Sequence, residues 1–150
     1  MQLSADKCKE STVYFKKNKQ SFDPVVVGGK ELSKEQCAKI LGVTISKDLK
    51  WNGHVYESIR KANKRLHFLV LLKRAGVSHQ DIIQFYCAVI RSVLEYCTPI
   101  LHHSLPEYLS EHLERVQKRT MSIIAPYQSS KQSLESYGLF TLGQRCDDHC

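Results

Sequence analysis

The sequence predicts an α+β fold: a small N-terminal β cluster followed by a three-helix, mainly α bundle. Short runs of β-branched and aromatic residues, separated by turn residues, occupy residues 1–50. Apolar residues then recur at helical spacing through residues 51–126. Residues 127–150 are mostly polar and predict a tail with a short helix at 131–137. These three ranges are the predicted parts of the chain.

The β cluster is predicted from three short runs, preceded by a helical start around residues 4–10. The runs are "TVYF" at 12–15, "VVV" at 25–27 and "KILGVTIS" at 39–46. Gly42 lies inside the third run, where a glycine usually marks a bulge or a place where another backbone comes close.

The first predicted helix covers residues 52–74 and carries many positive charges. Its inward face is predicted to consist of Val55, Ile59, Ala62, Leu66 and Leu69. Arg60 and Lys64 are four residues apart, as are Lys61 and Arg65, and like charges at this spacing repel by a few tenths of a kcal/mol. The helix either holds these charges for an anionic partner or simply solvates its outer face.

Two more helices are predicted, at 79–97 and 106–124. Gly76 ends the first helix, Ser78 caps the second, and prolines 99 and 126 stop the second and third. The inward residues of the second helix are predicted to be Ile82, Tyr86, Val89, Ile90, Val93 and Cys97. Those of the third are Leu109, Leu113, Val116, Ile123 and Ile124, with Gln117, Lys118 and Arg119 on its polar side.

The charge of the chain favours an anionic partner. Its 150 residues include 22 Lys and Arg against 15 Asp and Glu, a net charge of +7. Such a balance suits nucleic acid or an acidic surface, although a solvated basic surface gives the same count. No run reaches the roughly 18 apolar residues of a membrane span, and the N-terminus has no apolar core of a signal peptide. The chain is predicted to be intracellular, nuclear or cytoplasmic, with no membrane partner.

No catalytic, metal or cofactor site is predicted. The sequence lacks phosphate-binding glycine loops and the common hydrolase motifs. Its six cysteines are irregularly spaced, which favours reduced, mostly buried thiols. The cluster "CDDHC" at 146–150 lacks the second cluster that zinc sites normally use, and His102-His103 is interpreted as part of a solvated loop.

Several motifs, taken in order, resemble one family. Together they are similar to the end of the palm and the thumb of reverse transcriptases from non-LTR (LINE-type) retrotransposons. The resemblance covers residues 1 to about 146 and rests on "MQLSADKCKE", "KILGVTISKDLKWNGHV", "KANKRLHFLVLLKRAGV", "FYCAVIRSVLEYCTPIL", "LERVQKRTMSII" and "YGLFTLGQRC". Two positions depart from the family pattern: Ser4 stands where Asn is typical, and Cys146 replaces the second of two closing arginines.

The resemblance implies roles for particular residues. Leu41, Gly42 and Val43 match the stretch near the primer grip, where a glycine lets backbone approach the primer strand. Trp51 is expected to anchor the thumb helix on the palm strands, although an ordinary core Trp would look the same. The expected contacts to the backbone of an RNA or DNA template–primer duplex are Lys61, Lys64 and Arg65, then Lys118 and Arg119.

The resemblance also implies that this chain is not an enzyme by itself. The family's catalytic Tyr-x-Asp-Asp box would precede residue 1, so the chain is predicted to be a truncated fragment of an RNA-directed DNA polymerase. Without those metal-binding carboxylates it cannot polymerise DNA, although affinity for a template–primer duplex could remain.

Two alternatives stay open. The chain could be a non-catalytic helical interaction module that self-associates through an exposed strand edge. Its central region also resembles segments labelled as an AlkB-like N-terminal domain. No His-x-Asp…His iron triad accompanies it, so activity of its own is not expected.

Overall fold

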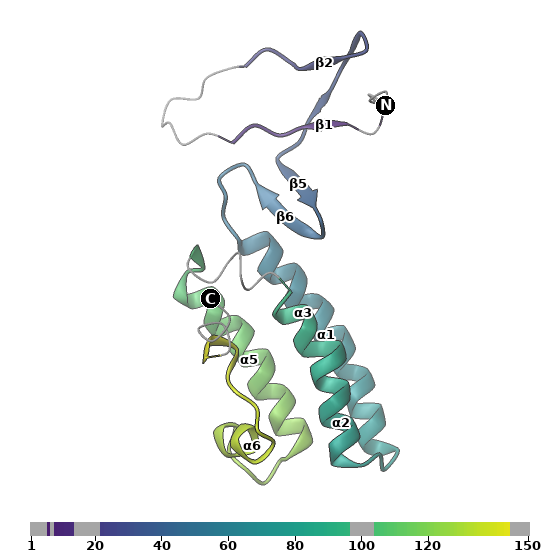
Figure 1. Ribbon diagram of the computed structural model, residues 1–150, viewed down its shortest axis with the longest axis vertical. Helices are drawn as coiled ribbons and strands as arrows, with labels where there is room; N and C mark the ends of the chain where they lie inside the picture. Colours follow the sequence, from purple (N-terminus) through teal and green to yellow (C-terminus); the bar gives the residue numbers. More distant parts are fainter. Residues whose placement is uncertain (1–5, 7, 14–21, 97–103, 145–150) are drawn as a thin grey trace. The chain divides into compact units, whose positions relative to one another are not determined.

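The computed structural model describes residues 6, 8–13, 22–96 and 104–144. The chain divides into two compact units, Met1–His54 and Val55–Cys150. Short strands make up the first unit and helices the second (Figure 1), so the predicted α+β class is confirmed. The division falls four residues after the boundary predicted at residue 50.

The strands of the first unit pair in three two-stranded sheets within the described region. Strand β1 (Lys9–Glu10) pairs in parallel with β4 (Ser33–Lys34), and β2 (Val26–Val27) pairs antiparallel with β3 (Lys30–Glu31). The predicted helical start is therefore wrong for Lys9 and Glu10. Thr12 and Val13 do not belong to a strand, and the rest of the run at 12–15 lies outside the described residues.

The run predicted as one strand at 39–46 is a hairpin instead. Strand β5 (Cys37–Ile40) pairs antiparallel with β6 (Val43–Ser46), and Ile40 lies opposite Val43. The two residues between them, Leu41 and Gly42, both have positive φ, at 48° and 84°. Positive φ at both central residues is typical of the type I′ turn that closes two-residue hairpins. Gly42 therefore serves the turn and does not lie in a strand interior.

Helix α1 (Asn52–Arg74) has the predicted bounds. Gly76, two residues after the last helical residue, terminates it with a φ of 76°, the left-handed conformation that glycine adopts without strain. The amide of Val77 bonds to the carbonyl of Leu72 at 3.2 Å, and that of Gly76 to Lys73 at 3.1 Å. These two bonds form the Schellman motif that satisfies the last carbonyls of a helix.

The second predicted helix contains a π-helical turn. Helix α2 (His79–Phe85), the π-helical segment η2 (Tyr86–Arg91) and α3 (Ser92–Leu94) follow one another without a break. Ser78 caps α2 by accepting a bond from the amide of Asp81, as predicted. A π turn holds one residue more than an α turn. The buried positions are accordingly Arg91, the last residue of η2, and Leu94 in α3, where sequence periodicity predicted Val93.

The C-terminal part of the chain joins the helical core. Helix α5 (Glu107–Ile124) is followed by α6 (Ser130–Ser136). Lys73 of α1 donates hydrogen bonds to the carbonyls of Ile123 and Ile124, the last residues of α5, where a cation stabilises a helix end. Leu134 and Leu142 are buried. The prediction of a polar tail is therefore wrong for these residues, because their side chains close one side of the core.

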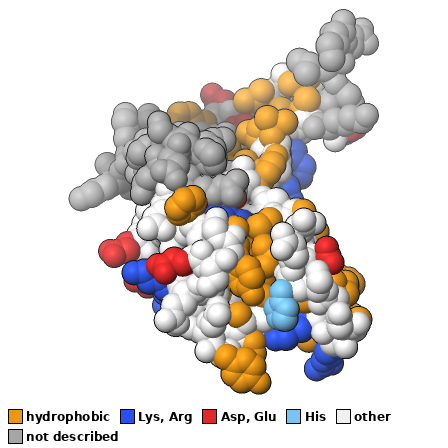
Figure 2. Space-filling view, turned by 60° about the horizontal axis from the view of Figure 1, so that its bottom comes forward, with side chains coloured by type: hydrophobic (Ala, Val, Ile, Leu, Met, Phe, Trp, Pro, Cys, Tyr) orange, Lys and Arg blue, Asp and Glu red, His pale blue; other side chains and the backbone are white. Residues whose placement is uncertain are grey.

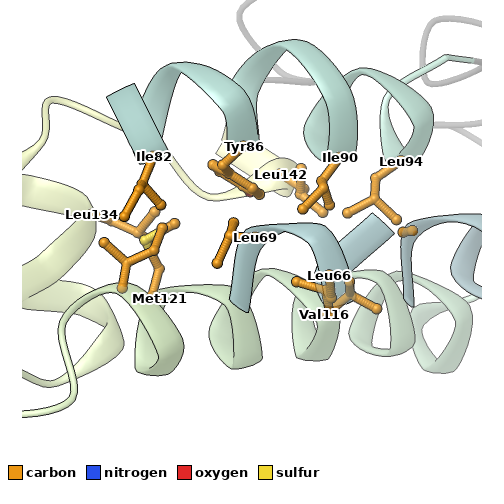
Figure 3. Packing of buried hydrophobic residues seen from close by; sticks show 12 residues of the cluster. Leu66, Leu69, Ile82, Tyr86, Ile90, Leu94, Val116, Met121, Leu134 and Leu142 are labelled. Carbon is orange, nitrogen blue, oxygen red and sulfur yellow. The ribbon is translucent and has the colours of Figure 1, made fainter. Parts of the chain in front are cut away.

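Side chains from α1, the α2–η2–α3 helix, α5 and the C-terminal segment form one hydrophobic core (Figure 3). Leu66 of α1 lies beside Val116 of α5, and Leu134 of α6 lies beside Met121. Four of the five residues predicted to face inward from α1 are buried, and Ile59 packs against them half-buried. On α5, Gln117 is fully buried, so its predicted place on the polar side is wrong.

The Tyr86 hydroxyl is a buried polar group that a conservative substitution by phenylalanine can remove. Tyr86 is fully buried, and within the described residues its hydroxyl has no hydrogen-bond partner. Burial raises the pKa of this hydroxyl above its usual value. Removing such a hydroxyl also removes its desolvation penalty, so Tyr86→Phe is expected to stabilise the chain by about 1 kcal/mol.

Urea unfolding of the full chain measures this change directly. The control is Tyr127→Phe, since Tyr127 is fully exposed and the same substitution there should change the unfolding free energy by less than about 0.5 kcal/mol. A loss of about 1 kcal/mol on Tyr86→Phe would show that the hydroxyl is hydrogen-bonded in the folded chain.

Candidate nucleic-acid interface

The outer face of α1 displays three cations within little more than one turn. Arg60 and Lys64 are exposed, and Lys61 keeps 43% of its side chain exposed. Lys61 forms an ion pair with Glu57 at 3.1 Å, four residues earlier in the helix. Surface pairs of this kind contribute a few tenths of a kcal/mol, so the Lys61 ammonium can exchange this partner for an anion.

Arg65 differs from its neighbours. It is half-buried, and its guanidinium donates a hydrogen bond to the carbonyl of Val89 in the π-helical segment. The resemblance implied that Arg65 contacts a nucleic-acid backbone, but here it links α1 to η2. The exposed cations Arg60, Lys61 and Lys64 are therefore better placed than Arg65 for an anionic ligand.

Lys118 and Arg119 are exposed neighbours on α5. On the same face, Arg115 forms an ion pair with Glu111 at 3.6 Å. On the face that Figure 2 shows, Lys and Arg side chains lie in separate small groups, some of them beside acidic residues. The α5 cations are therefore part of a mixed-charge surface.

The hairpin tip carries Leu41 and Gly42, two of the three residues matched to the primer-grip stretch. Leu41 is 86% exposed, while Val43 is buried. A left-handed conformation costs an ordinary L-residue about 1–2 kcal/mol, and type I′ turns favour Asn-Gly at these two positions. An exposed leucine held in this conformation is the kind of local strain that accompanies functional surfaces.

The strain at the hairpin tip gives a direct prediction. Leu41→Asn is expected to stabilise the β5–β6 hairpin by about 0.5–1 kcal/mol, because Asn tolerates positive φ. Amide hydrogen exchange of β6 would then slow about threefold. Gly42→Ala should do the reverse, since alanine is strained at a φ of 84°. Faster exchange in Leu41→Asn would mean that the leucine side chain stabilises the hairpin.

A short polar loop connects β6 to α1. Ser46 Oγ donates to Asp48 Oδ1 at 2.6 Å and accepts from the Lys50 amide at 3.1 Å. The hydrogen bond from Ser46, with further bonds and charge from Lys50, lowers the pKa of Asp48 to about 2. The bonded Asp48 carboxylate therefore orders the loop above about pH 4, and this contribution is lost as the pH falls through about 2.

Trp51 lies half-buried directly before α1. A second residue at this helix end, His54, contacts the strands. Its buried side chain accepts a hydrogen bond at Nδ1 from the Thr44 amide of β6, at 3.4 Å. His54 lies in the same motif, "KILGVTISKDLKWNGHV", as Trp51, the residue that the resemblance implies as the anchor. His54 is thus a second candidate for the anchor.

The helical unit contains a buried polar cluster that was not predicted from the sequence. Arg91 is 1% exposed; its Nε bonds Glu95 at 2.7 Å and its Nη2 donates to the Phe140 carbonyl at 3.0 Å. Gln117 donates to the same carbonyl at 3.0 Å and accepts from the Leu142 amide at 3.1 Å. An arginine inside the apolar run "AVIRSVL", with Glu four residues later, was the available signal.

In the part of the chain that the structure describes, no three His, Cys, Asp or Glu side chains come together to hold a metal ion. The "CDDHC" cluster and His102-His103 lie outside the described residues. None of the described cysteines, Cys8, Cys37 and Cys87, forms a disulfide. Cys37 is exposed and the other two are half-buried, so the expectation of mostly buried thiols is wrong for these three. No described helix is both long and apolar enough to span a bilayer.

Comparisons with known proteins add no assignment. No protein-family model, curated protein or solved structure matches the chain.

Proposed function

We propose that this chain is a palm-end and thumb-like segment of a non-LTR retrotransposon reverse transcriptase that binds the backbone of a template–primer duplex. The observation that carries the proposal is the exposed cationic face of α1, formed by Arg60, Lys61 and Lys64. Cations spaced one helical turn apart suit contacts to successive phosphates, which position a duplex without reading its sequence.

Two further features support the same assignment. The net charge of +7 favours association with polyanions. The strained, exposed Leu41 lies at a hairpin tip, and the matching family stretch lies near the primer grip. Lys118 and Arg119 provide a second pair of exposed cations on α5.

We further propose that the chain does not catalyse polymerisation by itself. Two-metal phosphoryl transfer requires carboxylates that converge on two Mg²⁺ ions. The sequence contains no Tyr-x-Asp-Asp box. Its contribution to a polymerase would be to hold the nucleic acid.

Binding to a fluorescently labelled RNA–DNA hybrid duplex tests this proposal. Fluorescence anisotropy of the duplex should report binding whose log K falls linearly with log salt, with a slope of roughly −0.9 for each phosphate neutralised. An affinity that does not change with salt concentration, or no binding in about 50 mM salt, would contradict the proposal.

Self-association is the second candidate function. In the described region every strand belongs to a two-stranded sheet, so each strand has one side that no other strand pairs. Such edges can pair with another chain. Light scattering over a range of protein concentrations separates the two cases, since a constant monomer mass would count against self-association.

A further inference from the structure

Helix α1 and the helix that begins with α2 lie side by side (Figure 1). Residues of α1, α2 and η2 line an open apolar groove. Its volume is about 740 Å³, and only one of its lining residues, Arg65, is polar. The apolar lining consists of Phe68, Leu71, Leu72, Ala75, Phe85, Ala88 and Val89. Phe68 is 56% exposed and Leu71 is 44% exposed, so this surface is open to solvent in the described unit.

The groove has a charged end. Arg65, Phe68, Leu72 and Ala75 follow one another on α1 at spacings of three and four, and so form one stripe. Lys64 lies on the same stripe one turn before Phe68, and Lys61 lies about two turns before it. From Arg65 to Ala75 the stripe is about 15 Å long, at a rise of 1.5 Å per residue.

We propose that this groove binds an amphipathic helix of a partner protein, about three turns long, with apolar anchors on one face and Asp or Glu at one end. The length matches the stripe. Anchors at i, i+3 or i+4, and i+7 are how such helices occupy apolar grooves. The acidic end would lie against Lys61 and Lys64, so charge fixes the direction of the bound helix. This proposal does not rest on nucleic-acid binding.

The charge and the lining of the groove favour a partner helix over two other occupants, a second copy of this chain and single-stranded nucleic acid. A second copy of this chain would bring its own cations to a surface that already carries Lys61, Lys64 and Arg65, and like charges across an interface are unfavourable. Single-stranded nucleic acid binds on aromatic platforms. Five of the seven apolar lining residues here are aliphatic, which suits Leu, Ile or Met side chains better than bases.

The test uses the full chain and a synthetic helical peptide of about three turns, labelled with fluorescein, with leucines at i, i+4 and i+7 and glutamates at one end. Anisotropy should show saturable binding. Phe68→Ala and, separately, Leu71→Ala should each weaken it about tenfold, the loss typical of an anchor residue. The same peptide with lysines in place of the glutamates should bind at least about tenfold more weakly.

Phe140→Ala is the matched control, because Phe140 is 57% exposed, almost the same as Phe68, and does not line the groove. It should leave peptide binding unchanged. Thermal unfolding followed by circular dichroism checks that each variant is folded.

Three outcomes would overturn the proposal. The first is that the peptide does not bind, or binds Phe68→Ala and Leu71→Ala as tightly as the wild-type chain. The second is that sedimentation shows a dimer of the wild-type chain and only a monomer of Phe68→Ala. This result would assign the groove to a second copy. The third is loss of RNA–DNA duplex affinity in Phe68→Ala, which would assign it to bases. Duplex binding that fails while the peptide binds would reject the proposed function alone.

Discussion

Replacement of Arg91 by alanine should destabilise the chain by about 3 kcal/mol or more. The guanidinium is 1% exposed and lies in the π-helical segment η2, where it bonds both Glu95 and the Phe140 carbonyl. Without it, the Glu95 carboxylate, whose side chain is only 19% exposed, loses its cation. Gln117 would then be the remaining side-chain donor to Phe140 within the described residues.

A second ion pair in the same chain provides the control for Arg91. Arg115 and Glu111 are also four residues apart on a helix, but their side chains are 67% and 60% exposed. The distance from Arg115 Nη2 to Glu111 Oε2 is 3.6 Å. Arg115→Ala should therefore cost less than about 1 kcal/mol. Urea unfolding of both variants compares a buried with an exposed Arg–Glu pair, and equal losses would contradict a structural role for Arg91.

Removal of two α1 cations should weaken nucleic-acid binding strongly. In Arg60→Ala/Lys64→Ala the slope of log K against log salt should fall in magnitude by about 2, roughly one for each lost phosphate contact. Both side chains are exposed, so the free energy of unfolding should change by less than about 0.5 kcal/mol for each substitution. Binding should weaken for every duplex sequence alike, because phosphate contacts carry no sequence information.

The variant Lys47→Ala/Lys131→Ala tests whether binding depends on the location of the α1 cations or only on the net charge of the chain. Lys47 and Lys131 are exposed, and their loss lowers the net charge by the same amount. If the α1 face is the binding surface, this pair should keep most of the wild-type slope. An equal loss in both variants would mean that binding follows net charge and has no defined site.

Regular periodicity was enough to predict the helices, because α1 shows an unbroken inward pattern from Val55 to Leu69. Periodicity failed where the structure departs from a regular repeat. The π turn moves the buried face from Val93 to Leu94 and brings Arg91 inside. The Leu41-Gly42 turn divides one apolar run into a hairpin, and a leucine with positive φ is not a usual turn signal.

The sequence was enough to predict which cations the candidate site on α1 contains, but not which contacts their side chains make. Sequence spacing placed Arg60 with Lys64, and Lys61 with Arg65, on shared faces of the predicted helix. It could not show that Arg65 turns inward to the Val89 carbonyl, because that contact joins residues on two helices. The same limit applies to Gln117, whose partners Phe140 and Leu142 lie in the segment predicted as a polar tail.

The most direct test of the proposed function is a map of the bound surface. Backbone amide chemical shifts of the full chain would be recorded by NMR as an RNA–DNA hybrid duplex is added. The largest changes should fall around Arg60–Lys64 of α1, with a second group at the hairpin tip near Leu41. Changes confined to other surfaces, such as the region of Lys131, would contradict a binding face on α1.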